Sequence, residues 1–395
     1  MKLKDIFEKP ISGEWGKEIE EGIKGSKVIR TTNFTNDGNL DLSSIVERDI
    51  DLIKYENKKL KFGDIIIEKS GGSPIQPVGR VVIFEVNDDE VYFCNNFTSI
   101  LRPNKNIVPK FGLYLLKDLY NKKKVLKFQN KTTGIINIKL NDYLNSTEIT
   151  IPNLEVQNKI IEVLDKVKEL IDKRKEQIGF LDELVKSKFI EMFGDPVSNS
   201  KGLNKIGIGQ RFEIKTGATP SRKENSFWEN GIIPWVKTTE LKEYTIYKTE
   251  EYITEEGFNN SSVNLLPKNT VLIAMYGQGK TRGMTGKLGI EATTNQACAA
   301  ILPNNKDNMN FVWYQLRLLY EDLRELGRGG SQPNLNTNLI KSYKLIFPLI
   351  ELQNQFADFV KQVDKLKFEM ENSLKELEDN FNSLMQRAFK GELFN

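Results

Sequence analysis

Five loops of the chain combine Lys or Arg with Gly, Ser, Thr, Asn and Gln, and this combination suits binding to DNA. Lys and Arg bind phosphates, while hydroxyl, amide and guanidinium groups bind base edges in the grooves. The candidate contact residues in and beside these loops are Lys69, Ser73, Arg80, Lys131 and Thr132 in the first half of the chain, and Lys215, Thr219, Ser221, Arg222, Lys237, Gln278, Lys280, Arg282, Arg328, Ser331 and Gln332 in the second half.

The positive charge of the chain lies in the segments that contain these loops. The whole chain has 57 basic and 54 acidic residues, a formal charge of +3. Residues 1–151 carry +3 and residues 197–346 carry +5, whereas residues 152–196 carry −2 and residues 347–395 carry −3. Ordinary solvated surfaces show excesses of this size, and each loop is also compatible with a plain turn. The DNA-binding hypothesis therefore depends on the local composition of the loops.

The composition excludes the commonest kinds of catalytic site. The sequence contains no histidine, which excludes Ser-His and Cys-His dyads, histidine bases and histidine-containing zinc sites. Its two cysteines, Cys94 and Cys298, form no CxxC pair and no disulfide framework. No stretch of the sequence has the length and apolarity of a signal peptide or a transmembrane helix. We therefore expect a cytoplasmic protein with no membrane partner.

Two motifs resemble parts of enzymes without completing them. Asp64 with Glu68 and Lys69 resembles a metal-dependent nuclease core, but adjacent residues of a strand point to opposite faces. A strand end that turns into a Gly-rich loop fits this segment better. Gly279-Lys280-Thr281 does not complete a phosphate-binding loop, because Ala274 stands where that motif requires glycine. We find no catalytic constellation and no metal site in the sequence.

The chain is an internal repeat. Ile-Pro-Asn-Leu-Glu-Val-Gln-Asn at 151–158 recurs as Phe-Pro-Leu-Ile-Glu-Leu-Gln-Asn at 347–354, an offset of 196 residues. Without a gap, the same offset pairs Val167 with Val363 and Phe193 with Phe389. A looser similarity relates the segments between, where the segment from Phe111 resembles the segment from Phe311.

Each copy of the repeated motif begins a long helix. Both segments lack internal proline and carry apolar residues at heptad spacing, such as Leu164, Ile171 and Val185 in the first. Residues 153 to 193 would form a rod of roughly 60 Å, which is too long for an amphipathic helix packed on one small domain. Pairing the two helices buries both apolar faces, and a repeat related by a two-fold axis favours the antiparallel orientation.

The sequence therefore predicts an α+β fold built as a pseudo-two-fold repeat. Short apolar runs, punctuated by Gly, Asn and Pro, predict twisted, irregular β-sheets with one or two helices in each variable module. The predicted domains are a first module at 1–151, a long helix at 152–196, a second module at 197–346 and a second long helix at 347–395, with the two helices forming an antiparallel coiled coil.

The chain resembles the specificity subunit of Type I restriction-modification systems over essentially its whole length. The resemblance lies in the order of the elements and in six motifs: the doubled Pro-x-x-Glu-x-Gln-Asn helix entry, and the segments 192–196, 216–221, 295–301, 329–336 and 388–393. The first module departs from this pattern, since it lacks the Thr-Pro-Ser loop and has Ile-Ile-Asn-Ile at 135–138 in place of the Gly-Gly-Ser-Gln segment.

The resemblance implies that each module is a target recognition domain that reads one half of a bipartite double-stranded DNA target, and that the helices set the gap. It also implies partners: two methylation subunits docked on the helices, and restriction subunits in the full complex. S-adenosylmethionine, and ATP with Mg, are then expected on those partners and not on this chain, which is expected to be non-catalytic. The flipped adenine would be methylated on the partner.

Two other functions stay open from the sequence. A metal-dependent nuclease, or a fused restriction-modification enzyme, predicts metal-dependent cleavage by the isolated chain. A scaffold that does not bind DNA would explain the helices but would leave the basic loops without a role.

Overall fold

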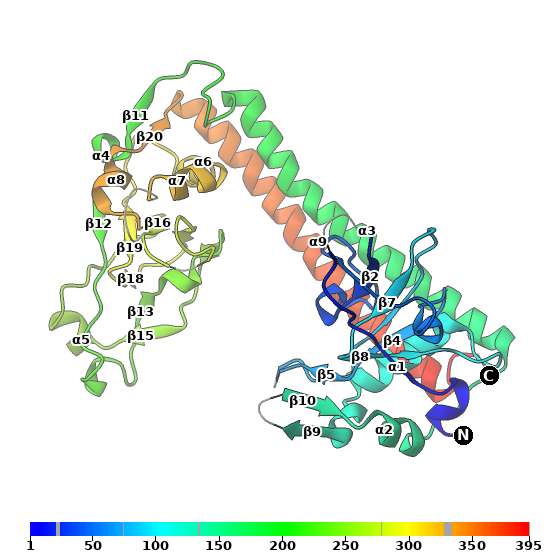
Figure 1. Ribbon diagram of the computed structural model, residues 1–395. Helices are drawn as coiled ribbons and strands as arrows, with labels where there is room; N and C mark the ends of the chain where they lie inside the picture. Colours follow the sequence, from blue (N-terminus) through cyan, green and yellow to red (C-terminus); the bar gives the residue numbers. More distant parts are fainter. Residues whose placement is uncertain (21–23, 74, 133–134, 278, 328–333, 395) are drawn as a thin grey trace. The chain divides into compact units, whose positions relative to one another are not determined.

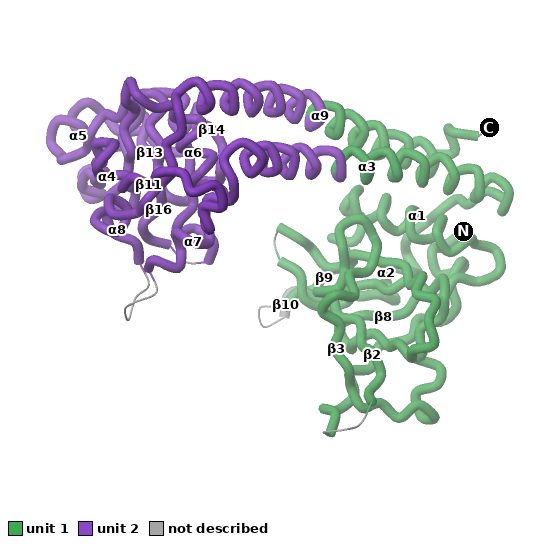
Figure 2. Tube along the Cα trace, turned by 90° about the horizontal axis from the view of Figure 1, so that it is seen from above, with its two compact units in different colours: residues 1–175, 372–395 green, residues 176–371 purple. Residues whose placement is uncertain are grey.

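The structure is a computed structural model, and it describes residues 1–20, 24–73, 75–132, 135–277, 279–327 and 334–394 (Figure 1). The chain forms two compact units (Figure 2). Unit 1 comprises residues 1–175 and 372–395, and unit 2 comprises residues 176–371. Each unit takes in one module and about half of each long helix.

Unit 1 is built on a four-stranded antiparallel sheet with the strand order β1-β8-β4-β6. A second sheet has the order β3-β2-β7, and a third has the order β5-β10-β9. The bounds of the strands are β1 Ile11–Ser12, β2 Ser26–Ile29, β3 Val46–Arg48, β4 Ile65–Glu68, β5 Ser70–Gly71, β6 Val81–Ile83, β7 Tyr92–Cys94, β8 Thr98–Leu101, β9 Gln129–Thr132 and β10 Ile135–Ile138. The helices are η1 Leu3–Ile6, η2 Thr31–Asn33, η3 Glu56–Lys58, α1 Pro109–Asn121, η4 Lys124–Phe128 and α2 Leu140–Ser146.

Unit 2 has a five-stranded sheet with the order β12-β19-β16-β17-β14, a three-stranded sheet with the order β15-β13-β18, and the pair β11-β20. Its strands are β11 Lys205–Gly207, β12 Ile214–Thr216, β13 Ile233–Val236, β14 Thr245–Ile246, β15 Glu251–Ile253, β16 Val271–Ala274, β17 Thr285–Leu288, β18 Thr293–Thr294, β19 Cys298–Ile301 and β20 Lys344–Ile346. Its shorter helices are α4 Ile208–Arg211, η5 Asn225–Phe227, η6 Thr238–Glu240, α5 Glu255–Asn259, α6 Met309–Leu318, α7 Tyr320–Glu325 and α8 Thr337–Ser342.

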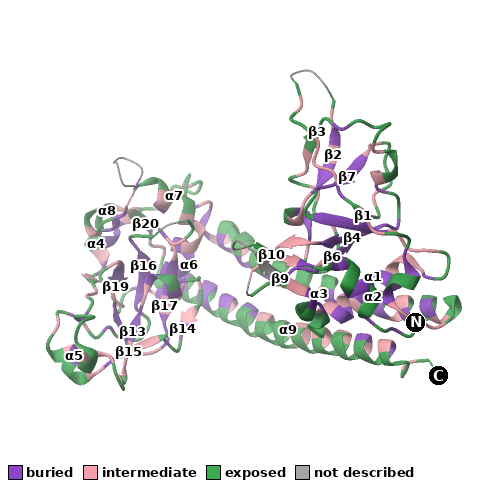
Figure 3. Ribbon diagram, turned by 60° about the horizontal axis from the view of Figure 1, so that its bottom comes forward, coloured by how far each residue is buried: buried purple, intermediate pink, exposed green. Residues whose placement is uncertain are grey.

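The two modules share one topology, which confirms the predicted α+β repeat. The order β1-β8-β4-β6 in unit 1 matches β12-β19-β16-β17 in unit 2, and β3-β2-β7 matches β15-β13-β18. The inner strands β4, β8, β16 and β19 are buried along their whole length (Figure 3), and this burial is why β4, β16 and β19 read as short apolar runs. The predicted helical stretches after Phe111 and Phe311 each divide into two shorter helices.

One position in each module requires glycine for the same structural reason, which is a close approach of two backbone segments. A Cβ atom at Gly13 would lie 2.0 Å from the carbonyl oxygen of Asn95, and one at Gly217 would lie 2.0 Å from that of Thr294. Only glycine lets the chain leaving the first strand of the sheet pass this close to the turn that precedes β8 or β19.

The two long helices are α3, Leu154–Phe193, and α9, Ile350–Lys390. Each begins and ends within a few residues of its predicted bounds. In unit 1, the N-terminal half of α3 packs with the C-terminal half of α9; in unit 2, the C-terminal half of α3 packs with the N-terminal half of α9. The predicted antiparallel pairing is therefore confirmed in both units. Lys367, which interrupts the apolar seam of α9, forms an ion pair with Asp182 at 2.7 Å.

Each module contacts both long helices through equivalent residues. In unit 1 the ring of Phe111 on α1 lies 5.2 Å from that of Phe389 at the end of α9. In unit 2 the ring of Phe311 on α6 lies 5.0 Å from that of Phe193 at the end of α3. These contacts explain why Phe193 and Phe389 occupy equivalent positions in the repeated sequence.

A buried glutamine joins each module to the start of the helix that follows it. The Gln157 side chain accepts from the backbone N–H of Val108 at 2.8 Å and donates to the carbonyl oxygens of Asn106 and Pro152. Gln353 in unit 2 accepts from the backbone N–H of Asn308 at 3.0 Å. Both side chains are buried, at 0% and 1% exposure. The amide supplies a donor and an acceptor together, which accounts for glutamine in both copies of the motif.

Replacing Gln157 with Ala is expected to lower the free energy of unfolding by about 1 to 3 kcal/mol, because buried backbone groups lose their partners. Chemical denaturation followed by circular dichroism measures this change. Asn158→Ala is the matched control, since Asn158 is the exposed neighbour in the same motif. Equal stability of the two variants would contradict the role of the Gln157 contacts.

Candidate nucleic-acid interface

The loop at residues 217–222 of unit 2 is held by two tryptophans. The indole N–H of Trp235 donates to the carbonyl oxygen of Ala218 at 3.0 Å, and that of Trp228 donates to the carbonyl oxygen of Ser221 at 3.0 Å. The backbone N–H of Ala218 also donates to Thr294. Thr219, Ser221 and Arg222 are exposed on this loop. The loop therefore presents polar side chains on a fixed backbone.

Arg222 lies on the same two aromatic rings. Its guanidinium carbon is 3.5 Å from the ring centroid of Trp228 and 4.9 Å from that of Trp235. Glu251 binds Arg222 at 2.6 Å and Lys237 at 2.9 Å. Burial opposes ionisation of Glu251, but the hydrogen bonds from Arg222 and Lys237 outweigh it and lower its pKa. The structure thus brings two predicted contact residues together around one carboxylate.

Gln296 lies beside this loop but was not among the contact residues predicted from the sequence. Thr219 donates its hydroxyl hydrogen bond to the side-chain oxygen of Gln296, which is exposed on the turn before β19. The equivalent turn of unit 1 carries the exposed Asn96. The signal was present in the sequence, because the Asn295-Gln296 pair belongs to a segment that carries the family resemblance. Its place beside Thr219, 77 residues away, depends on the fold.

The other predicted contact residues of unit 2 have partners outside the cluster formed by Arg222, Lys237 and Glu251. Lys280 is exposed, and its carbonyl oxygen accepts from the Tyr320 hydroxyl. Arg282 is 8% exposed, and its carbonyl oxygen accepts from Arg324. Lys215 lies 3.5 Å from Glu213. Gln278, Arg328, Ser331 and Gln332 lie outside the described residues.

In unit 1 the predicted residues have more internal partners. Lys69 donates to the Ser12 hydroxyl at 3.2 Å, and burial lowers its pKa. The Ser73 hydroxyl accepts from the backbone N–H of Gln76 at 3.0 Å. The backbone of β9 contains Lys131 and Thr132, whose side chains lie outside the described part of the structure. Whether any of these residues contacts DNA stays a prediction.

Both acidic residues of the nuclease-like segment form buried ion pairs. Asp64, 1% exposed, accepts two hydrogen bonds of 2.8 Å from Arg102. Glu68, 2% exposed, accepts from Arg80 at 3.0 and 3.1 Å. The Arg80 guanidinium is therefore engaged with Glu68. Among the residues the structure describes, no group of three or more acidic or cysteine side chains is placed to hold a metal ion. No helix of that same part is long and apolar enough to span a membrane.

The sequence and the fold both match known proteins. Residues 1–179 and 201–379 match the family described as the Type I restriction modification DNA specificity domain. The EcoR124I/EcoR124II specificity subunit of Escherichia coli is 28% identical over 153 residues, 38% of this chain and 38% of that protein. The MjaIX specificity subunit of Methanocaldococcus jannaschii is also matched over 38% of its length. The putative MjaX specificity subunit of the same organism is 24% identical over 92% of this chain and 86% of its own.

Two solved structures share the fold. A chain from a type I R-M system, studied for complex assembly and conformational transition, superposes with a TM-score of 0.63 at 16% identity, covering 100% of this chain and 97% of that one. The S subunit of a Type-I restriction-modification system from M. genitalium superposes with a TM-score of 0.54 at 18% identity, covering 98% and 95%.

Replacing Glu68 with Ala is expected to lower the free energy of unfolding by about 3 to 5 kcal/mol, because it leaves the Arg80 charge partly buried without its partner. Denaturant unfolding measures the loss, and Glu85→Ala, at an exposed position, is the control. A nuclease role for Glu68 predicts instead a metal-dependent cleavage that the variant loses while its stability is kept.

Proposed function

The chain belongs to the Type I restriction modification DNA specificity domain family, and from this premise we propose that it supplies DNA sequence specificity to a Type I restriction-modification complex. Each module would read one half of a bipartite target, and α3 with α9 would set the gap. The observation that carries this proposal is the repeat itself: two modules that share the order of four strands in one sheet and of three in another, with different loops, each joined to both long helices.

The chemistry of base reading is best supported in unit 2. The guanidinium carbon of Arg222 lies close to two tryptophan rings and its charge is paired with Glu251, so its position is largely fixed before DNA binds. A guanidinium edge suits the O6 and N7 atoms of guanine, and an amide such as that of Gln296 suits adenine. Lys237 and Lys280 would add phosphate contacts.

The helices would carry the methylation subunits. Leu154 and Leu170 on α3 are exposed, and so are their repeat equivalents Ile350 and Leu366 on α9. Exposed apolar side chains at matching positions suggest two equivalent docking sites, one in each unit. Methyl transfer with S-adenosylmethionine, and ATP- and Mg-dependent cleavage by restriction subunits, would then belong to the partners.

The decisive experiment for this function is co-expression with the methylation partner, followed by mapping of methyladenine across the host genome. A bipartite sequence with a constant gap is the expected result. Methylation without such a motif, or DNA cleavage by the purified chain alone in the presence of Mg, would contradict the proposal.

Replacing Arg222 with Ala is expected to reduce discrimination at one base of one half-site by about 1 to 3 kcal/mol, while the other half-site is still read. Methylation of duplexes that carry single base changes in either half-site measures this effect. Lys223→Ala, at the next exposed position, is the control. Unchanged discrimination in the Arg222 variant would remove this residue from base reading.

Replacing Leu170 or Leu366 with Asp is expected to remove one methylation subunit each, and the double variant is expected to bind none. The folding of the chain should be unaffected, because both side chains are exposed. Native mass spectrometry of the assembled complex counts the subunits. Lys361→Asp, at an exposed position of α9, should leave two subunits bound.

A further inference from the structure

Two lysines of unit 1 converge on one backbone oxygen. Lys117 on α1 and Lys168 on α3 both donate to the carbonyl oxygen of Asp37, Lys168 at 3.4 Å. Lys168 also donates to the amide oxygen of Asn39 at 3.2 Å. Among the described residues, neither ammonium group has a carboxylate within ion-pair distance. Burial, and next the nearby Lys168, lower the pKa of Lys117 to about 8.

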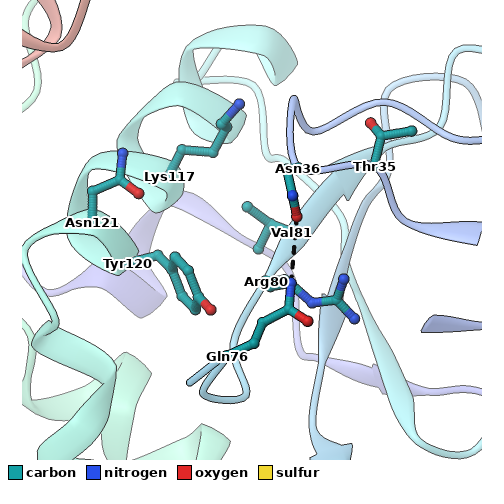
Figure 4. Close-up of a pocket in the computed structure, with 8 residues that line it drawn as sticks. All are labelled: Thr35, Asn36, Gln76, Arg80, Val81, Lys117, Tyr120 and Asn121. Atoms are coloured by element: carbon teal, nitrogen blue, oxygen red, sulfur yellow. Dashed lines mark hydrogen bonds between the residues drawn. The ribbon is translucent and has the colours of Figure 1, made fainter. Parts of the chain in front are cut away.

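Two adjoining pockets share Lys117, and the second of them also contains Lys168. The first, of about 220 Å³, is lined by Lys117, Tyr120 and Asn121 of α1 and by Asn36, Gln76 and Arg80 (Figure 4). Asn36 and Gln76 are joined by a hydrogen bond of 3.3 Å along its edge. None of the described residues that line this pocket carries a carboxylate.

The second pocket, of about 230 Å³, contains Lys117, Lys168 and Lys175. Its carboxylates are those of Asp37, Asp172 and Glu378, and Glu378 pairs with Lys175 at 3.1 Å. Asp37 and Asp172 are exposed residues.

Comparison with unit 2 shows how the charges around Lys117 differ from those around its repeat equivalent. The 196-residue offset pairs Lys168 with Asp364, and the correspondence of Phe111 with Phe311 pairs Lys117 with Arg317. Asn36 and Glu243 are equivalent because each lies three residues after the matching short helix, η2 or η6. Arg317 pairs with Glu243 at 3.4 Å and interacts electrostatically with Asp364. The cation of α6 thus faces two carboxylates, one of them in an ion pair, whereas the cation of α1 faces an amide, a second cation and, beyond ion-pair distance, the exposed carboxylate of Asp37.

We propose that Lys117 and Lys168 form a binding site for a phosphate-type oxyanion, which supplies the negative charge that Glu243 and Asp364 supply in unit 2. An oxyanion would accept charge-assisted hydrogen bonds from both ammonium groups and remove the repulsion between them. The side-chain amides of Asn36 and Asn121 line the adjoining pocket and offer further donors. A free phosphate compound and a DNA backbone phosphate share this chemistry.

Titration of the full-length chain with inorganic phosphate at constant ionic strength tests the site. Thermal unfolding of the unaltered chain should show saturable stabilisation. Lys168→Asp installs the charge that unit 2 has, so it should raise the melting temperature without phosphate and weaken phosphate binding at least tenfold. Lys168→Gln gives a second test with the same expected loss of affinity, should the Asp variant fold poorly.

Lys166→Asp is the matched control, because it makes the same charge change at an exposed position of the same helix. It should keep the affinity of the unaltered chain. Absence of saturable stabilisation in the unaltered chain, or phosphate affinity in both Lys168 variants equal to that of the unaltered chain, would overturn the proposal. These measurements use no DNA, so their failure leaves the proposed function untouched.

A second arm identifies the source of the phosphate. Binding of a duplex is measured against salt concentration for the unaltered chain and for Lys168→Gln. If the site holds a DNA phosphate, the slope of log affinity against log salt falls by about 0.9 in the variant. An unchanged slope, with phosphate affinity lost, assigns the site to a free phosphate compound.

Discussion

The architecture depends on the antiparallel pairing of α3 with α9, because each module completes its core with parts of both helices. Module one binds the start of α3 through Gln157 and the end of α9 through Phe389. Module two binds the start of α9 through Gln353 and the end of α3 through Phe193. A parallel pair would place the two starts together, and neither module could make both contacts. The same sequence motif therefore serves twice with opposite helix directions.

The burial of these helix faces is the main source of stability for the arrangement. Phe193 and Phe356 are fully buried with Phe311, and Met385 is buried in the core of unit 1. Burying a side chain of this size is worth about 1.5 to 3 kcal/mol, and several such side chains lie on each helix. The loops that would touch DNA lie outside these contacts, so their sequences can differ between modules while the shared topology is kept. Gly13 and Gly217 mark where each shared sheet gives way to a different loop.

The features that follow from local pattern were predictable from the sequence. Heptad spacing gave the long helices, and the offset of 196 residues gave the equivalence of Phe193 and Phe389. The partners of the charged residues were not predictable in this way. Arg80 meets Glu68 because β4 and β6 pair antiparallel, and Arg102 meets Asp64 across 38 residues. Of the predicted contact residues, four lie outside the described residues, and the cluster at Arg222 emerged only when the fold brought Trp228, Trp235 and Glu251 together.

The ion pairs also explain why net charge is a poor guide to a surface that binds DNA. Arg80, Arg102 and Arg211 each hold a buried carboxylate, so their charges are neutralised within the fold. Such pairs contribute equally to the basic and acidic counts and say nothing about the surface. A DNA backbone would instead contact the exposed basic side chains, such as those of Lys280 and Arg222. A chain with a formal charge of +3 can thus present locally basic loops. By the same reasoning Lys117 and Lys168 are unusual, since they converge on one carbonyl oxygen and, within the described part of the chain, neither has a carboxylate at ion-pair distance.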